Sequence, residues 1–457
     1  MACPARAKSP PRRHLARARR CKEMLCLNPI KLEATNRFAQ LGPYPRATRK
    51  PNPGTGFAAA EIHSPPNLRP AMTRPERLSV CYVEPGRDFR PGSSHSRQVL
   101  ALARALAGRA DVSVVFRRLA GQPAVEGCGV SALEPGAGLR DRSGASRPAL
   151  GRFVERRAGD FGVILEAGWS MPGKLTAWCS QRGIPAIPVL DGLAPTSWLG
   201  SLDPGSGWLG LGSSGRDLRR APVVVAASPA LRDAMVERWR IDPARIVVIG
   251  PAIDRTVFSP RDQFEARRKL GMDPAHRIVL AGDGLGPGPD LSPLVEAVQR
   301  AGDPALRLHV LGEGERLAAL RRLAGSGPSV TFHGSPPDDV LAAYIAAADL
   351  CLSVGRSDDP CFTPLECFSS ARPVAVAGAP DRVHLPIQPL VNGFVVEHDL
   401  LAWIRFLQRD CPSRNALRMM GMAASGTPIE PMDRIAVAYL AVIDRALAED
   451  ARPAAVV

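Results

Sequence analysis

The chain has 457 residues, of which 45% are hydrophobic and 23% are charged, and this length is sufficient for two or three domains. Residues 1–71 carry 14 basic and 3 acidic side chains, whereas the other 386 residues carry 45 and 41. The formal net charge of +15 therefore belongs mostly to one end of the chain. The near-neutral body argues against a dedicated nucleic-acid binder.

Residues 1–71 show no sustained helical or strand period and few large apolar residues, which predicts a disordered basic leader. The segment also lacks the apolar region of a secretory signal. Met72 opens a sequence of different character, which favours Met72 as the natural start and residues 1–71 as an upstream extension of the reading frame. A basic arm for RNA or anionic lipid, and an organelle-targeting peptide, stay open as alternatives.

The cysteines give no metal-site signal. The sequence has ten of them, none forms C-x-x-C, and none has histidine neighbours at zinc-ligand spacing. We therefore expect no metal and a reducing cytoplasm. No apolar run approaches the roughly 18 residues needed to span a bilayer, although peripheral contact with the inner face of a membrane stays open.

From residue 78 onward, short apolar strands alternate with amphipathic helices. Strands are predicted at 80–83, 112–116, 162–165, 184–190, 223–226 and 245–249, with helices at 96–107, 173–181 and 229–239. A connection rich in Gly, Pro and Arg follows the second strand up to about residue 147. Buried strands that alternate with helices predict a parallel sheet covered on both faces.

The same alternation starts again after residue 276. Strands are predicted at 277–281, 306–311, 330–333, 350–353, 373–377 and 393–397, with helices at 291–300, 315–324, 338–348, from about 363, and at 433–448. The economical architecture is α/β with two tandem doubly wound units, residues 72–255 and 256–430.

The most informative stretch is residues 358–366, Asp-Asp-Pro-Cys-Phe-Thr-Pro-Leu-Glu. The buried strand 350–353 precedes a loop that holds Asp358 and Asp359, and the short helix that follows carries Glu366 in its first turn. Two acidic groups eight residues apart, one before a helix and one inside it, can face a single cleft.

This stretch resembles the acidic motif of family-4 glycosyltransferases, retaining enzymes that use nucleotide sugars and place two glutamates with seven residues between them. The resemblance runs from about residue 78 to 448, and its further matches in order are 228–233, 243–260, 311–315, 330–334, 344–350 and 392–396. It implies the GT-B fold, in which two Rossmann-like domains face across a cleft. Residues 72–255 would bind the acceptor, residues 256–430 the nucleotide sugar, and helix 433–448 would return to the first domain.

The resemblance implies donor-binding roles around this motif. Glu366 would accept hydrogen bonds from the ribose hydroxyls, and Asp358 stands where the family has a glutamate that contacts the transferred sugar. Asp359 is an alternative to Asp358, and the helix start at Thr363 and Leu365 would hold the diphosphate. The plainer alternatives are a solvated first-turn glutamate and an acidic surface loop.

The largest departure from the family lies in the loop after strand 277–281. The family places an Arg and a Lys there to neutralise the diphosphate without a metal, whereas a gapless match puts Asp283 and Gly288 at these positions, after Gly282. An anion about 4 Å from a phosphate costs roughly 4 kcal/mol at an effective dielectric of about 20. We therefore hypothesise that Arg356 supplies the cation, with backbone N–H groups of the loop as a further phosphate ligand.

In the first domain, residues 90–97 match the family's glycine-rich loop, which approaches the donor phosphates and the acceptor. Gly92 would allow close backbone approach, Ser93 or Ser94 would cap the following helix, and His95 would lie near the acceptor. Asp191 stands where the family tends to have a histidine, and it would position a hydroxyl group. A lone loop histidine is also commonly inert.

The sequence thus predicts a glycosyltransferase that moves a sugar from a nucleotide-sugar donor to an acceptor hydroxyl, with retention and without a metal or other cofactor. The acceptor class stays open between a glycan, a lipid-linked acceptor and a small molecule. Two alternatives remain: a catalytically impaired relative that binds nucleotide or glycan as a partner subunit, and a nucleotide-sugar epimerase, which shares the architecture.

Overall fold

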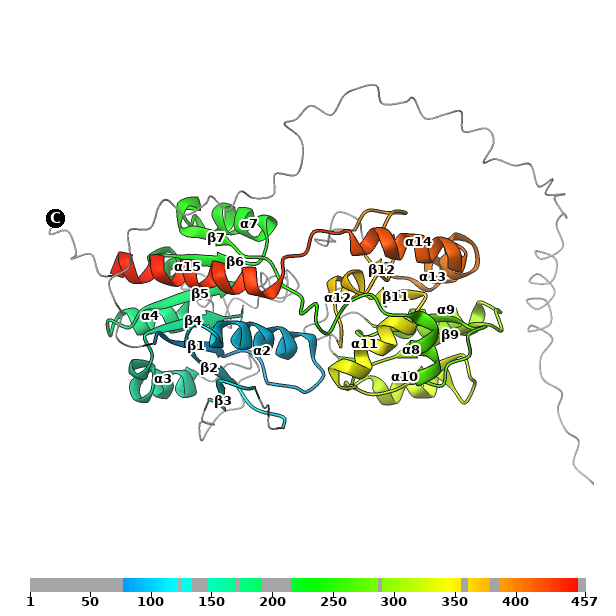
Figure 1. Cartoon of the computed structure of the whole chain (residues 1–457), viewed down its shortest axis with the longest axis horizontal. Coiled ribbons are helices and arrows are strands. Elements are labelled where there is room, and N and C mark those ends of the chain that lie inside the picture. The colour runs from blue at the N-terminus through cyan, green and yellow to red at the C-terminus, as the bar shows by residue number, and fades with distance from the viewer. Residues whose placement is uncertain are drawn as a thin grey trace, which may run out of the picture. The chain divides into compact units, whose positions relative to one another are not determined.

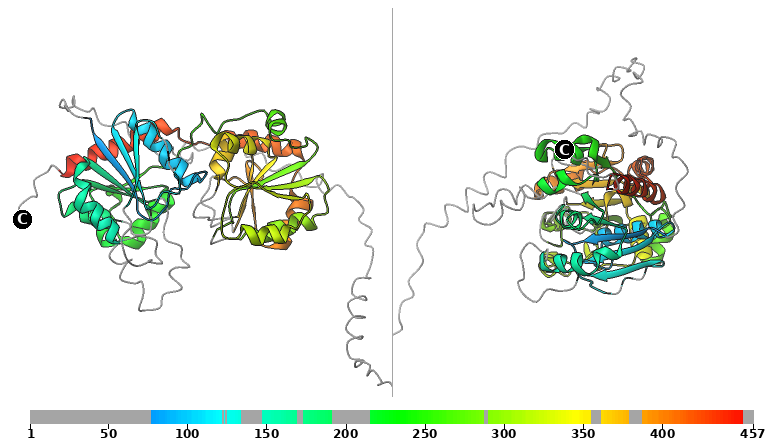
Figure 2. Two further views of the ribbon diagram at one scale, coloured as in Figure 1. Left: turned by 90° about the horizontal axis from the view of Figure 1, so that it is seen from below. Right: turned by 90° about the vertical axis from the view of Figure 1, so that its left-hand side faces the viewer.

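The computed structural model describes residues 77–450, except for residues 122, 124, 134–146, 169–172, 191–214, 287–289, 355–360 and 379–386. Residues 1–71, the predicted leader, lie outside the described residues. The described chain builds two parallel sheets with helices on both faces (Figures 1 and 2), as the alternation of strands and helices predicts.

The first sheet has its strands at β1 (Ser79–Glu84), β2 (Asp111–Phe116), β3 (Cys128–Ala132), β4 (Val163–Ala167), β5 (Ala186–Leu190), β6 (Val224–Ala226) and β7 (Ile246–Val248). Their order is β3-β2-β1-β4-β5-β6-β7, and every pair is parallel. The helices of this lobe include α2 (Ser94–Ala107), α3 (Arg147–Arg156), α4 (Lys174–Ser180) and α7 (Pro229–Trp239). The order reverses between β1 and β4, which creates a crevice at the carboxyl ends of these strands.

The second sheet has its strands at β8 (Arg277–Ala281), β9 (Leu306–Val310), β10 (Val330–Phe332), β11 (Leu350–Ser353), β12 (Val374–Ala377) and β13 (Gly393–Val396). Their order is β10-β9-β8-β11-β12-β13, again parallel throughout, with the reversal between β8 and β11. The helices are α8 (Gln263–Lys269), α9 (Ser292–Arg300), α10 (Leu317–Ala324), α11 (Asp338–Ala347), α12 (Pro364–Ser369), α13 (Leu400–Arg405) and α14 (Arg414–Ser425).

The last helix, α15 (Met432–Asp450), returns to the first lobe, as predicted. It packs beside α2 and β5 (Figure 1) and contributes Ile435, Tyr439 and Ile443 to the first lobe's core. The chain therefore crosses between the lobes twice, after β7 and before α15. The two crossing segments are joined by a β-bridge between Ile253 and Pro431, and the Arg255 side chain donates to the Ile429 carbonyl at 3.2 Å.

The sequence prediction was incomplete at the sheet edge and on the helical surface. The expected connection up to residue 147 contains β3, whose residues are all partly exposed or exposed, so the strand lacks the apolar run of its neighbours. Helices α3, α8, α13 and α14 were not predicted either. The short α8 buries only Ala266 and Arg267, which is too small an apolar stripe to reveal a helix.

Candidate active site

The local sequence fixes the position of Glu366 through a capping box. Thr363 has an extended backbone, and its Oγ1 accepts from the Glu366 backbone N–H at 3.3 Å. In return, Glu366 Oε2 accepts from the Thr363 N–H at 2.6 Å. This reciprocal pair begins α12 and holds the carboxylate rigidly, with Glu366 only 1% exposed. The side chain of Leu365 lies in the core of the second lobe.

The second oxygen of Glu366 is bound from the first lobe. Arg97, on α2, donates through Nε to Glu366 Oε1 at 2.9 Å. The same guanidinium donates to Asp338 Oδ1 on α11 and to the Cys361 carbonyl, both at 2.9 Å. Burial opposes the charge of Arg97, but Glu366 and Asp338 outweigh it and raise the guanidinium's pKa. One side chain therefore ties three points of the second lobe to α2.

Sequence reasoning missed Arg97, although it lies within the matched glycine-rich loop. A weak signal was present, because a cation near the start of a helix faces the positive end of the helix dipole. Such a placement indicates that the side chain has partners elsewhere. Those partners are more than 240 residues away in the sequence, so no local pattern could name them.

The glycine-rich loop reaches the second lobe at Gly92. This residue has φ of +76°, and a Cβ atom there would lie 2.8 Å from the Cβ of Ser335, so the position favours glycine on two grounds. Ser93 is the N-cap of α2, and its Oγ accepts from the Ser96 N–H at 3.1 Å. The loop is thus placed at the junction of the lobes, while its contact with a donor stays a prediction.

Asp283 is held by β11 in a way the sequence did not reveal. Its carboxylate accepts from the Ser353 hydroxyl at 2.7 Å and from the Val354 N–H at 3.0 Å, so it joins the ends of β8 and β11. Burial raises the pKa of Asp283 to about 6, although these hydrogen bonds oppose the shift. The preceding Gly282 lies under Phe362, and a side chain there would overlap the ring.

His95 lies on the first turn of α2, and its ring contacts partners in the first lobe. Its Nε2 is 3.0 Å from Glu84 Oε1, and its Nδ1 is 2.7 Å from an Arg87 nitrogen. The other named candidates, Asp191, Gly288, Arg356 and Asp358, lie outside the described residues, so their roles stay predictions.

The described part of the chain contains no cluster of three or more His, Cys, Asp or Glu side chains suited to a metal ion. Nor does any helix in the described ranges combine the length and apolar character needed to cross a bilayer.

Two family models match the chain. The model "Glycosyltransferase Family 4" matches residues 95–257, and "Glycosyl transferases group 1" matches residues 275–409. The first range contains every strand of the first sheet except β1, and the second contains every strand of the second sheet.

Two relatives carry the name D-inositol 3-phosphate glycosyltransferase. The protein from Geodermatophilus obscurus is 31% identical over 240 residues, which cover 48% of this chain and 52% of the relative. The protein from Segniliparus rotundus is 26% identical over 214 residues, which cover 45% of each chain. The matches thus span about half the length of these relatives.

Solved structures share the architecture over most of the chain. Sucrose-phosphate synthase from Thermosynechococcus elongatus has a TM-score of 0.66 at 19% identity, covering 82% of this chain and 100% of that one. Anabaena Alr3699/HepE, solved with UDP and glucose, has a TM-score of 0.61 at 15% identity, covering 80% and 99%. At these identities the likeness concerns the fold. A Family 4 model and a group 1 glycosyltransferase model thus match the two lobes in chain order, and the chain has the GT-B architecture of two Rossmann-like lobes.

Proposed function

We propose that this protein transfers a sugar from a nucleotide-sugar donor to an acceptor hydroxyl. The observation that carries the proposal is the position of Glu366, a carboxylate fixed by a capping box at the junction of the two lobes. An ionised carboxylate is a strong acceptor for the two hydroxyls of a ribose. UDP and glucose were found with the structural neighbour Alr3699/HepE, which supports a nucleotide-sugar donor.

Donor binding requires Arg97 to change partners. Both Glu366 oxygens already accept hydrogen bonds, and the side chain is 2% exposed, so ribose hydroxyls reach it only when Arg97 withdraws. A guanidinium released beside the donor would pair with the diphosphate, which offers oxygens in bidentate geometry. Arg97 thereby supplies the cation that the second lobe lacks at Asp283 and Gly288, and Arg356 remains a further candidate.

The placement of Asp283 supports this charge arrangement. Its carboxylate is engaged with Ser353 and Val354, and its raised pKa reduces its negative charge near pH 6. The repulsion of about 4 kcal/mol expected for a free anion beside a phosphate is reduced at and below about pH 6, whereas at neutral pH the carboxylate is mostly ionised. Donor binding at neutral pH therefore relies on the cation that Arg97 supplies.

In the proposed reaction, the bond between the sugar and the diphosphate breaks, and the diphosphate leaves with the bonding electrons. The acceptor oxygen forms the new bond to the same carbon and loses its proton. Retention of the sugar's configuration and independence of a metal rest on the family resemblance. The anomeric form of the product, read by NMR, and activity in the presence of EDTA test these two points.

The test begins with thermal unfolding of the whole chain in the presence of ADP, GDP, UDP, CDP and dTDP. We expect one nucleoside diphosphate to raise the melting temperature specifically, and the corresponding sugar nucleotides then to be consumed. Binding without consumption, with or without an acceptor, would identify an impaired relative that retains only the site. Formation of an epimer without loss of the nucleotide would instead identify an epimerase.

A further inference from the structure

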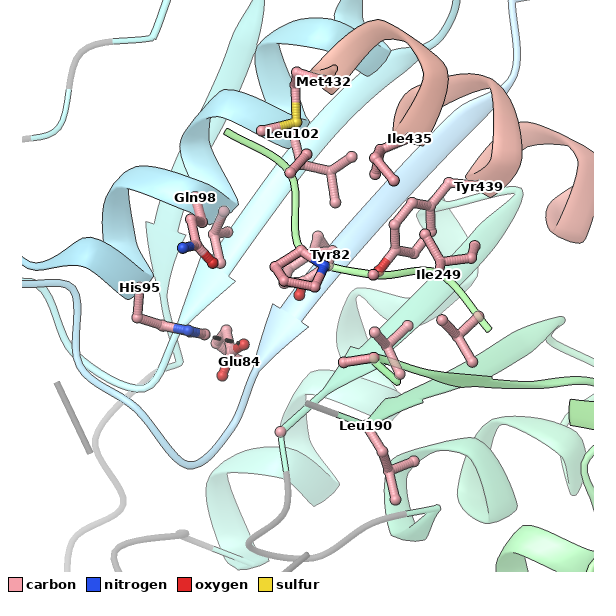
Figure 3. A pocket seen from close by; sticks show the side chains of 18 residues that line it. Tyr82, Glu84, His95, Gln98, Leu102, Leu190, Ile249, Met432, Ile435 and Tyr439 are labelled. Atoms are coloured by element: carbon pink, nitrogen blue, oxygen red, sulfur yellow. Dashed lines mark ion pairs between the residues drawn. The ribbon is translucent and has the colours of Figure 1, made fainter. Parts of the chain in front are cut away.

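A second site lies inside the first lobe, where a pocket opens among α2, α15 and the carboxyl ends of the central strands (Figure 3). Its cavity volume is about 110 Å³. Most of the lining is apolar, with Leu102 and Ile435 as examples, and two aromatic side chains, Tyr82 and Tyr439, form part of the wall. Such a wall with a few polar groups is typical of small-molecule sites.

The polar end of this pocket is made by Glu84, the last residue of β1. Glu84 is 1% exposed, yet neither of its carboxylate oxygens accepts a hydrogen bond from the described residues. His95 Nε2 lies at an ion-pair distance of 3.0 Å from Oε1, without the alignment of a hydrogen bond. Figure 3 shows the two side chains pointing toward each other. A buried carboxylate that lacks donors costs stability, so its presence calls for an explanation.

Two other buried carboxylates show how this chain normally satisfies such groups. Glu166, on β4, accepts from the Leu175 N–H at 3.0 Å and from the N–H and hydroxyl of Thr176 at 2.8 and 2.7 Å. Asp283 joins β8 to β11 through Ser353 and Val354. Both hold secondary structure together, whereas Glu84 makes no such hydrogen bond to the described residues.

The position of Glu84 in the sheet also favours a ligand. It ends β1, and Gly168 follows β4, so the two lie on either side of the point where the strand order reverses. Ligands of open α/β sheets bind in the crevice at this point. A Cβ atom on Gly168 would lie 3.4 Å from Glu84 Oε2, an ordinary contact distance, and the φ of +93° at this position itself favours glycine.

Arg87 lies on the other side of this contact. Its Nη1 is 2.7 Å from His95 Nδ1 and 3.3 Å from Nε2. The imidazole contacts Glu84 at Oε1, and neither Glu84 oxygen accepts a hydrogen bond from the described residues, so the carboxylate keeps accepting capacity for a ligand.

We infer that Glu84 binds hydroxyl groups of a cyclic polyol acceptor that carries no phosphate. Among the pocket's described lining residues, Glu84 is the acid and His95 the other titratable group apart from the two tyrosines, while the Arg87 guanidinium contacts His95 at 2.7 Å without being a lining residue. A phosphate beside an unsatisfied carboxylate would be repelled, whereas a hydroxyl would supply the missing donor. The acceptor would then differ from the phosphorylated one that the names of the relatives imply. This inference rests on the proposed function, because it names the acceptor class.

The binding test uses the full chain saturated with the nucleoside diphosphate that stabilises it most. The probes are myo-inositol, methyl α-glucopyranoside and methyl α-mannopyranoside, each measured by calorimetry beside its monophosphate. We expect at least one free polyol to bind at least tenfold more tightly than its monophosphate. Glu84→Gln should weaken that binding about tenfold, whereas Glu237→Gln, a change of an exposed carboxylate in the same lobe, should leave it unchanged.

Binding of a monophosphate as tightly as its free polyol would overturn the inference, as would the absence of binding by every free polyol. An unchanged affinity in Glu84→Gln would also overturn it. Failure of the proposed function would give a different result, because the wild-type protein would then bind no nucleoside diphosphate at all.

A second measurement separates a binding role from a structural one. If Glu84 is kept for a ligand, Glu84→Gln should raise the melting temperature of the ligand-free protein, because an unsatisfied buried charge is removed. The expected rise in melting temperature is about 2–4 °C, which is the usual effect of a modest gain in unfolding free energy on a lobe of this size. A lower melting temperature would show that the pair with His95 stabilises the fold, and would overturn the assignment.

Discussion

Replacing Glu366 by Gln tests the proposed donor site without disturbing its frame. Gln at this position of a capping box can still accept from the Thr363 N–H, so α12 should keep its start. The change removes the negative charge while nearly preserving shape. A similar melting temperature for the variant and the wild-type protein would confirm that the fold is intact.

The magnitude follows from the hydrogen bonds involved. A bond to a charged group contributes about 1.5–3 kcal/mol and a neutral one about 0.5–1.5, so losing the charge costs about 1–1.5 kcal/mol per bond. Two ribose hydroxyls would form two bonds, but Glu366 gives up its bond from Arg97 Nε in exchange. One net charge-assisted bond remains, and its loss should raise the Kd about tenfold.

The assay is calorimetric titration of the preferred nucleoside diphosphate into each variant. Asp338→Asn is the matched control, because Asp338 is the other carboxylate that Arg97 binds and no donor role is proposed for it. We expect a change of less than threefold in this control. Equal losses in both variants would refute the reasoning, since they would show that the contact with Arg97, rather than a ribose, depends on Glu366.

Three further outcomes are expected. Arg97→Gln should weaken binding of the nucleoside diphosphate about tenfold while leaving the nucleoside within threefold, if Arg97 turns to the diphosphate; equal effects in calorimetry would contradict this. Because the pKa of Asp283 is raised to about 6 from 3.8, the folded state binds the proton more tightly than the unfolded state, and the free energy of unfolding should fall as pH rises from about 4 to 6. Asp283→Asn should flatten that fall, which urea denaturation at pH 4.5 and 7.5 would measure; an unchanged pH dependence would contradict it. Gly282→Ala should destabilise the protein by about 1–3 kcal/mol in urea because its methyl group meets the Phe362 ring, and an unchanged midpoint would contradict that contact.

Most of the buried strands could be predicted from the sequence because parallel strands that are covered on both faces form continuous apolar runs. Thus β5 and β12, with every residue buried, were predicted to within two residues. Strand β3 was not, since a partly exposed edge strand of small residues lacks such a run. Residue propensity and hydrophobic periodicity reflect local burial, so they predict an element poorly where it is short or half-exposed.

The candidate site was predictable only where the information is local. Glu366 follows Thr363 by three residues, and this spacing is itself a capping signal. The contact between Arg97 and Glu366 joins residues 269 positions apart, so it depends on the folded arrangement of both lobes. Glu84 was missed for a related reason, because its lack of hydrogen bonds can be recognised only once its neighbours are known.

The bridge between Ile253 and Pro431 bears on how the two lobes could move apart and together. With two connections fastened side by side, rotation of one lobe about a single covalent link is opposed, and bending across the pair is the freer motion. Closure along one direction would bring Arg97 of α2 back to the same position beside Glu366 of α12 each time. The paired connection would then restrict the lobes to one closing motion, so that each closure forms the same contacts around a bound molecule.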